Sequence, residues 1–319
     1  MSIDTVPPPP PIDSRISRML GIDYPIFQAP MGWIARAPLA SAVSEAGGMG
    51  IVETSSGELD IVKAEIARMP SLTGKPFGVN LPQLFMRDES IVDFLHEAGV
   101  RFVTTSAGDP RALCGRLKDA GITVFHVVPS LSAALKAEDA GVDGLIVEGG
   151  EGGGFKGPEP VSTFVLLPLV RSRTRLPLCA AGGICDGTSM AAAFVLGAEA
   201  VQIGTRMVAS EESPVHPNWK QAILSASDTG TVLLNRLGRP SLRALRSERT
   251  ARLEQLPSFA AFDEFKQAKQ LYFGGDMEAS IALAGQVAGR IDSVQPVRDI
   301  LHDMVRQFSL SLHKTAERV

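Results

Sequence analysis

The sequence predicts an α/β fold: a (β/α)8 barrel, or TIM barrel, with a small inserted or appended helical subdomain. Three observations favour this fold. Between Ser14 and Ser210, short apolar runs alternate with amphipathic stretches in units about 20 residues long, as in a βα repeat. A small residue followed by glycine repeatedly precedes the next apolar run, where the glycine can cap a helix in the left-handed conformation. The last two apolar runs end in glycine turns, at the position where such barrels bind phosphate.

Eight apolar runs are the predicted strands. They are short and continuous, which is typical of parallel strands buried on both faces. A doubly wound open sheet uses the same βα units and stays an alternative. The eight units and the two consecutive glycine turns favour the closed barrel. In chain order the predicted strands are Pro25–Ala29, Gly50–Glu53, Phe77–Asn80, Phe102–Thr105, Thr123–Val127, Gly144–Val147, Leu178–Ala181 and Ala200–Ile203.

The rest of the chain divides around the barrel, which we expect over residues 15–218. Residues 1–14 contain the proline run Pro7–Pro11, which predicts an extended and disordered tail. After Pro214 the strand pattern stops, so we expect a helical subdomain over 219–286 and a C-terminal helix that packs back on the barrel over 287–319. Arginines recur in the helical segment, where they predict a solvated face or, alternatively, a contact with an anionic substrate or cofactor.

Composition excludes several classes of protein. The net charge is −4, without a basic cluster, which argues against nucleic acid as a partner. No apolar run approaches about 18 residues, so no membrane span is expected. The N-terminus lacks a signal-peptide pattern, and Cys114, Cys179 and Cys185 have neither disulfide nor zinc spacing. We therefore expect a cytoplasmic protein that acts on a small molecule without a metal, with a homodimer as a candidate assembly.

Two consecutive strands end in a pattern that predicts a phosphate site. One strand ends in Ala181-Gly182-Gly183, and the next ends in Gly204-Thr205. Exposed backbone N–H groups at such turns bind anions. Because the carboxyl ends of parallel strands share one rim of a barrel, the two turns predict a phosphorylated ligand held between them.

Further candidate residues follow from the rule that barrel active sites lie at the carboxyl ends of strands. Asn80 ends the third strand and offers a donor and an acceptor to a heterocycle, with a turn-stabilising role as the alternative. The sixth strand leads into a loop with six glycines over residues 149–157, where backbone can lie against a flat ligand or act as a hinge. His126 lies in the fifth strand, where a site role and a hydrogen-bonded structural role are equally open.

Six motifs together resemble the nitronate monooxygenase family, formerly called 2-nitropropane dioxygenases. That family also includes the FMN-dependent enoyl-acyl-carrier-protein reductase II. The resemblance runs from about residue 15 to 225 and implies non-covalent FMN in a TIM barrel with an inserted helical domain. Its motifs are PIFQAPMGW (Pro25–Trp33), SEAGGMG (Ser44–Gly50), KPFGVN (Lys75–Asn80), VEGGEGGG (Val147–Gly154), CAAGGICDG (Cys179–Gly187) and VQIGTRMV (Val201–Val208).

The resemblance also implies roles for individual residues. One group would lie at the isoalloxazine ring of FMN, a second would flank the ring and the ribityl chain, and a third would hold the phosphate. The ring group is Ala29, Pro30, Met31, Gly32 and Asn80. The flanking group is Glu148, Gly153 and Gly154. The phosphate group is Ala181, Gly182, Gly183, Gly204 and Thr205.

The chain departs from the family pattern at Phe155. The family's strand-six loop normally has a histidine there, the proposed base for nitronates, and a phenylalanine side chain transfers no proton. His126 and Lys156 are the candidate substitutes; the residue after His126, a lysine in some relatives, is Val127.

Four functions follow from this combination of motifs. The family's usual reaction is oxidation of alkyl nitronates with O2. The alternative is reduction of an enone, an enoyl or ring coenzyme-A thioester, or a quinone, with NAD(P)H as a candidate co-substrate. A flavin-binding protein without catalysis and a flavin-free phosphosugar barrel are the further alternatives.

Overall fold

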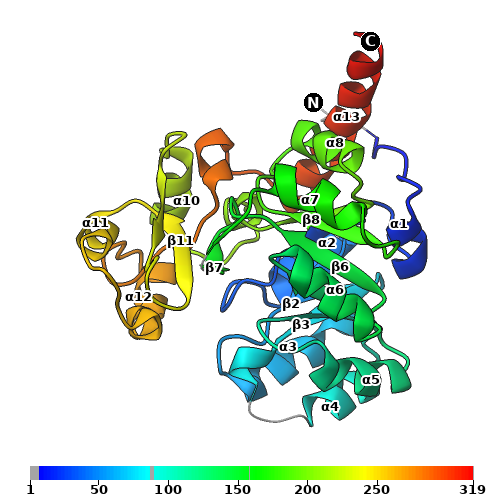
Figure 1. Cartoon of the computed structure of the whole chain (residues 1–319), viewed down its shortest axis with the longest axis horizontal. Helices are drawn as coiled ribbons and strands as arrows, with labels where there is room; N and C mark the ends of the chain where they lie inside the picture. The colour runs from blue at the N-terminus through cyan, green and yellow to red at the C-terminus, as the bar shows by residue number, and fades with distance from the viewer. Residues whose placement is uncertain (1–6, 87–89, 158, 319) are drawn as a thin grey trace, which may run out of the picture.

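Eight parallel strands form a barrel in the computed structural model, which describes residues 7–86, 90–157 and 159–318 (Figure 1). The strands are neighbours in the order β1-β9-β8-β6-β5-β4-β3-β2. All eight predicted strands are confirmed, with ends that shift by at most two residues. They are β1 (Ile26–Gln28), β2 (Gly50–Val52), β3 (Phe77–Pro82), β4 (Phe102–Ser106), β5 (Thr123–Val128), β6 (Gly144–Glu148), β8 (Leu178–Ala181) and β9 (Ala200–Ile203).

The contact between β1 and β2 closes the barrel and decides against the open sheet. Phe27 pairs with Met49 in a parallel bridge, and Gln28 N donates to Met49 O over 3.0 Å. The Gln28 side chain extends this seam, because its Oε1 accepts from Ile51 N over 3.2 Å and its Nε2 donates to Ala29 O. A side-chain amide thus supplies hydrogen bonds at a seam where the two strands are short.

Aromatic rings fill the inside of the barrel. Phe27, Phe102 and Phe125 pack with ring centroids 5.3–6.2 Å apart. Helix α1 (Arg15–Leu20) adds Ile16 and Leu20 to the same buried cluster. The amino end of the barrel is therefore a packed core, and only the carboxyl end is available for a ligand.

Helices cover the outside of the strands (Figure 1). The predicted glycine caps are confirmed: Gly47, Gly99, Gly121, Gly141 and Gly197 all have positive φ angles after a helix. The helices of the barrel are α2 (Ala37–Glu45), α3 (Leu59–Leu72), α4 (Ile91–Glu97), α5 (Arg111–Asp119), α6 (Leu131–Asp139), α7 (Thr163–Arg171), α8 (Gly187–Val195) and α9 (Thr205–Val208), with the short η1 (Gln83–Phe85) after β3.

The segment after the barrel contains strands, which corrects the expectation of a purely helical subdomain. β10 (Thr231–Leu234) and β11 (Ser241–Leu245) form an antiparallel sheet with β7 (Gly154–Lys156), which belongs to the strand-six loop. The strands were missed because they are short and because the third one lies in a glycine-rich run. Around them lie α10 (Pro217–Leu224), α11 (Glu248–Glu254), η2 (Ala261–Phe265) and α12 (Ala268–Tyr272), left of the barrel in Figure 1.

The two ends of the chain pack against the barrel. Residues 1–6 of the expected tail, and Val319, lie outside the described residues. The following prolines make specific contacts, which corrects the expectation of disorder there: Tyr24 Oη donates to Pro9 O over 2.7 Å, and Arg306 donates to Pro7 O over 2.9 Å. After η3 (Gln286–Arg290), α13 (Val297–Ala316) packs on α8 and α2. Within the described chain, no helix has the length and apolarity that crossing a membrane requires.

Candidate functional site

The inward face of the barrel strands ends at the carboxyl end in a ring of residues, four of which are polar. Each member lies two residues beyond a residue of the barrel interior, so its side chain points the same way. The interior residues are Phe102, Phe125, Ile146, Cys179 and Ala200. The ring residues are Thr104, Val127, Glu148, Ala181 and Gln202, joined by Asn80 of β3. The structure thus brings Asn80, Glu148 and Ala181 together, as the resemblance implies.

The two glycine turns lie side by side, because β8 and β9 are neighbours. Gly182 and Gly183 have φ angles of 90° and 77°, and Gly204 precedes α9. Among the described residues, the N–H groups of Gly182, Gly183 and Gly204 donate to no other group. All three glycines are half-exposed at the rim. Unpaired amides at two adjacent strand ends are donors for an anion.

Arg206 adds a positive charge next to the second turn. Its side chain is buried and donates to Ala209 O and Ser293 O over 3.0 Å and 2.7 Å. Its Nε is buried without a hydrogen-bond partner, and no described carboxylate forms an ion pair with it. A buried cation with no direct ion pair among the described residues, although Asp292 acts on it electrostatically, is compatible with an anionic ligand near this turn.

The β1–α2 loop lies beside the second glycine turn. A Cβ built on Gly204 would lie 3.4 Å from Ala29 Cβ and 3.8 Å from Met31 Sδ, and one on Gly32 would lie 3.0 Å from Ser55 Oγ. Ala29, Pro30, Met31 and Gly32 are all half-exposed at the rim. The loop that is predicted to lie at the isoalloxazine ring and the glycine turns that are predicted to hold the phosphate are therefore neighbours.

Glu53 fixes this loop, a role that was not predicted from the sequence. Its carboxylate is fully buried and accepts from the backbone N–H groups of Trp33 over 3.1 Å and Ser55 over 2.6 Å. It also forms an ion pair with Arg36 at 2.9 Å. Trp33 has a φ of 62°, which is unfavourable for a bulky residue, so these contacts hold a strained loop. The sequence feature that could have indicated this role is a carboxylate directly after an apolar strand.

Two amide side chains of the ring offer hydrogen-bond acceptors. Asn80 Nδ2 donates to Thr104 O over 3.1 Å and to Thr104 Oγ1 over 2.9 Å, which fixes the side chain and leaves Oδ1 as the acceptor. Gln202 Oε1 is buried without a partner. Both groups suit the N–H edge of a heterocycle. Gln202 was not predicted, because its strand is a short apolar run.

The glycine-rich loop after β6 is held at several points, which argues against the hinge alternative. Arg243 Nε donates to Gly150 O over 2.7 Å. The Glu151 carboxylate accepts from Thr163 N over 2.9 Å, and the Glu151 carbonyl accepts from Gln286 N over 2.9 Å. Arg243 contacts the backbone of this loop. It therefore does not support the alternative that the arginine-rich segment touches a ligand directly.

Lys156 and Glu148 form an ion pair at the rim. The Lys156 side chain is almost fully buried, whereas Glu148 is partly exposed. A Cβ on Gly152 would lie 2.8 Å from Lys156 Nζ and 2.9 Å from Glu148 Oε1, so a side chain there would displace the pair from its present position. A Cβ on Gly153 would lie 2.7 Å from the Ala284 carbonyl carbon, whereas one on Gly154 meets nothing within 4 Å. A lysine ammonium beside an inward-facing carboxylate is a candidate proton donor.

Phe155 belongs to an aromatic cluster that spans the barrel and the subdomain. Its ring centroid lies 5.9 Å from that of Phe85 and 5.8 Å from those of Phe262 and Phe265. Phe155 and Phe262 are nevertheless 37% and 46% exposed. The position where the family has a histidine is therefore part of an open, apolar wall.

His126 lies apart from these residues. Val124 and Val128 of the same strand belong to the core between strands and helices, so His126 also points outward, away from the ring. Its Nδ1 lies 2.7 Å from Thr105 Oγ1, and burial lowers its pKa from 6.5 to about 4. This position favours the structural role and gives His126 no access to a ligand at the rim.

The lowered pKa of His126 predicts an acid-sensitive fold. The unfolded state binds a proton below about pH 6.5 and the folded state only near pH 4, so stability is complete above pH 6.5 and is lost as the pH falls through this window. Urea unfolding at pH 7 and pH 4.5 should show that the protein loses about 2–3 kcal/mol more than its His126→Asn variant. Equal losses in both proteins would contradict this placement.

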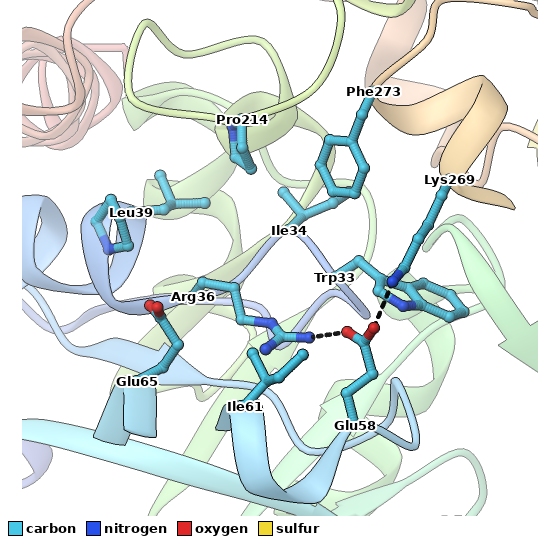
Figure 2. A pocket seen from close by; sticks show the side chains of 11 residues that line it. Trp33, Ile34, Arg36, Leu39, Glu58, Ile61, Glu65, Pro214, Lys269 and Phe273 are labelled. Carbon is cyan, nitrogen blue, oxygen red and sulfur yellow. Dashed lines mark hydrogen bonds and ion pairs between the residues drawn. The ribbon is translucent and has the colours of Figure 1, made fainter. Parts of the chain in front are cut away.

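A cavity of about 390 Å³ lies between the β1–α2 loop, α3 and the subdomain, and Trp33 forms part of its wall (Figure 2). Ile34, Ile61 and Phe273 line it. Glu58 joins its two sides, because it pairs with Arg36 at 2.9 Å and with Lys269 of α12. The subdomain is thus tied by ion pairs to the loop that Glu53 holds.

A family of known proteins matches the segment of the chain that contains these motifs. The family described as nitronate monooxygenase matches residues 13–94 and 83–307. The chain belongs to the nitronate monooxygenase family. A nitronate monooxygenase of Pseudomonas aeruginosa is 32% identical over 277 residues, covering 72% of this chain and 79% of that protein.

Other family members carry different names. A (3aS,4S,5R,7aS)-5-hydroxy-7a-methyl-1-oxo-octahydro-1H-indene-4-carboxyl-CoA dehydrogenase of Mycobacterium tuberculosis is 38% identical over 225 residues, 70% of this chain and 63% of that relative. The match with the same-named protein of Rhodococcus jostii spans 60% of its length. The structure of FabK from Thermotoga maritima has a TM-score of 0.92 at 37% identity, covering 97% of this chain and 100% of that one.

Proposed function

We propose that this protein is an FMN-dependent oxidoreductase that uses NAD(P)H to reduce a bulky, apolar enoyl or ring thioester. The observation that carries this proposal is the cluster of Phe155 with Phe85, Phe262 and Phe265 at the rim. Exposed aromatic rings bind apolar ligand surface and leave no proton-transferring group at the family's histidine position. The substrate class is a small molecule with a large apolar part.

The residues at the rim fit FMN. The free amides of Gly182, Gly183 and Gly204, with Arg206 beside them, match a phosphate dianion. Ala29 to Gly32 and the backbone of Gly153 to Gly154 offer a surface for a flat ring, and Thr205 directly follows Gly204 in the second turn. Asn80 and Gln202 offer acceptors at the ring's edge. When bound, FMN supplies two-electron transfer in the form of hydride.

Lys156 is the group that we assign to proton transfer. Reduction of a carbon–carbon double bond conjugated with a carbonyl adds a hydride to one carbon and a proton to the other, while NAD(P)H is oxidised to NAD(P)+. Lys156 Nζ would give the proton to the carbon next to the carbonyl. Glu148 holds the ammonium group at the rim, and Gly152 leaves the space that the pair needs.

The relatives support this substrate class. Two of them are named as dehydrogenases of a fused-ring CoA thioester. An apolar wall of four phenylalanine rings suits a fused ring better than a short nitroalkane. The likeness to FabK, which extends over nearly the whole chain, is consistent with a reductase built on the same barrel and subdomain.

Oxidation of alkyl nitronates is the second candidate. The family match and the nitronate monooxygenases among the relatives favour it. Nitronates are already carbanions, so an enzyme with Phe155 can retain some oxidation of them, at a rate that the family's histidine would raise. A flavin-binding protein without catalysis remains the outcome if neither class of substrate reacts.

Anaerobic stopped-flow absorbance of the flavin band tests the two candidates. The purified protein is mixed separately with NADH, NADPH and ethylnitronate. Fast bleaching by a nicotinamide supports the reductase, and reoxidation by a ring enoyl thioester then confirms the substrate class. Bleaching by the nitronate alone would replace the proposal with nitronate oxidation, and bleaching by neither would leave a non-catalytic flavin protein.

Phe155→His provides a second test at the same position. The substitution returns the family's proton-transferring group and removes one ring from the aromatic wall. We expect the rate with ethylnitronate to rise by about tenfold or more and the KM for an apolar thioester to increase, with the FMN content unchanged. Phe262→His, which places the same side chain on the subdomain side of the wall, is the matched control and should not raise the nitronate rate. A nitronate rate that Phe155→His leaves unchanged would contradict the assigned role of this position.

A further inference from the structure

Helix α7 has an outward face that is apolar. Phe164 and Val165 are 70% and 56% exposed, and Leu169 one turn later is 40% exposed. At 100° per residue these positions, with Pro168 between them, form one stripe along the helix. Leu135 of α6, the helix that packs beside α7, is also 40% exposed. Soluble proteins rarely expose a contiguous apolar stripe without a partner for it.

Charges of opposite sign flank this stripe. Glu159 lies before the amino end of α7, and Arg173 and Arg175 lie just after its carboxyl end. All three side chains are exposed, and none forms an ion pair with another described residue. A second helix in the same orientation would bring like charges together, whereas an antiparallel copy would bring Glu159 of each chain to the arginines of the other.

The stripe is also held rigidly. The first residue of α7, Thr163, donates its N–H to the Glu151 carboxylate and its hydroxyl to Gly182 O over 2.9 Å. The helix is therefore anchored to the strand-six loop and to the first glycine turn. A preformed platform binds a partner without the cost of ordering a mobile segment.

We infer that α7 is the centre of a two-fold interface between two copies of this chain, packed antiparallel along Phe164, Val165 and Leu169. A two-fold interface places the same patch on both chains, so the patch must be complementary to itself. The stripe meets this requirement, with an apolar centre and an acidic and a basic end.

Sedimentation velocity over a range of protein concentrations tests this interface. The unaltered protein should be a dimer, and Phe164→Glu should raise the dimer Kd by about 100-fold or more, because it places two carboxylates in the apolar centre. Leu237→Glu is the matched control: Leu237 is 82% exposed in the turn between β10 and β11, and the substitution should leave the Kd unchanged. Thermal unfolding shows whether each variant is folded.

A charge swap tests the antiparallel arrangement. Glu159→Arg and Arg173→Glu should each raise the Kd by about tenfold, and the double variant should recover to within about threefold of the unaltered protein. A protein that is monomeric at all soluble concentrations, or a dimer that Phe164→Glu leaves intact, would overturn the interface. A dimer that responds to Phe164→Glu but shows no recovery in the double variant would overturn the antiparallel packing.

Discussion

Gly183→Asp is expected to yield a folded protein that is purified without FMN. The substitution places a carboxylate at the turn where the proposed phosphate accepts from backbone amides. Two like charges about 4 Å apart repel by about 4 kcal/mol at the effective dielectric of a protein surface, which corresponds to roughly a 1,000-fold weaker Kd. The flavin-to-protein ratio and titration of the apoprotein with FMN measure the effect.

Two controls separate charge from geometry. The nearest neighbours of a new Cβ at Gly183 would be Glu151 side-chain atoms at 3.8 Å, so the fold has room for it, and aspartate tolerates a φ of 77° better than most residues. Gly99→Asp introduces the same side chain at a φ of 74° with nothing within 4 Å, and it should bind FMN normally. Gly183→Asn adds the same bulk without charge and should cost less affinity. If Gly183→Asp contained as much FMN as Gly99→Asp, the phosphate would have to bind elsewhere.

Lys156→Met is expected to lower kcat for reduction of an enoyl thioester by about 100-fold or more, because general acid catalysis contributes at least this much. The variant keeps the apolar stem and removes only the ammonium group. FMN binding and bleaching by NAD(P)H should persist, since neither step uses the proposed proton. Stopped-flow measurement of the two half-reactions separates the affected step from the unaffected one.

Three comparisons make the result for Lys156 specific. Lys118→Met removes a lysine from a more exposed ion pair, with Asp143 at 2.9 Å, and should leave kcat unchanged. Lys156→Arg keeps the charge and should recover part of the rate. Gly152→Ala should reduce kcat as well, because its methyl group would occupy the space of the Lys156–Glu148 pair. If Lys156→Met kept a normal kcat, the proton would come from solvent and Lys156 would have no role in proton transfer.

The barrel itself could be predicted from the sequence because its signals are local. A run such as Leu178–Ala181 is apolar at every position, and a glycine such as Gly141 follows five of the barrel helices. Both signals depend only on neighbouring residues. The glycine turns at Gly183 and Gly204 were predictable for the same reason, since each directly follows its strand.

The direction of a side chain in such a strand was not predictable. A strand buried on both faces has no alternation of apolar and polar residues, so the sequence does not say which face is the inside of the barrel. His126 was therefore a candidate for the site as well as for a structural role, and it lies on the helix side with Thr105. Gln202, in an equally apolar strand, lies on the inside and was missed.

The sequence by itself therefore determined the barrel, its eight strands and the two glycine turns, because backbone conformation and hydrophobic burial are encoded within each βα unit. Only the tertiary structure decided what surrounds those turns. Phe85, Phe155 and Phe262 come from three separate segments, and β7 pairs with a strand almost 90 residues further along the chain. Such contacts depend on how distant segments pack, and no local pattern carries that information.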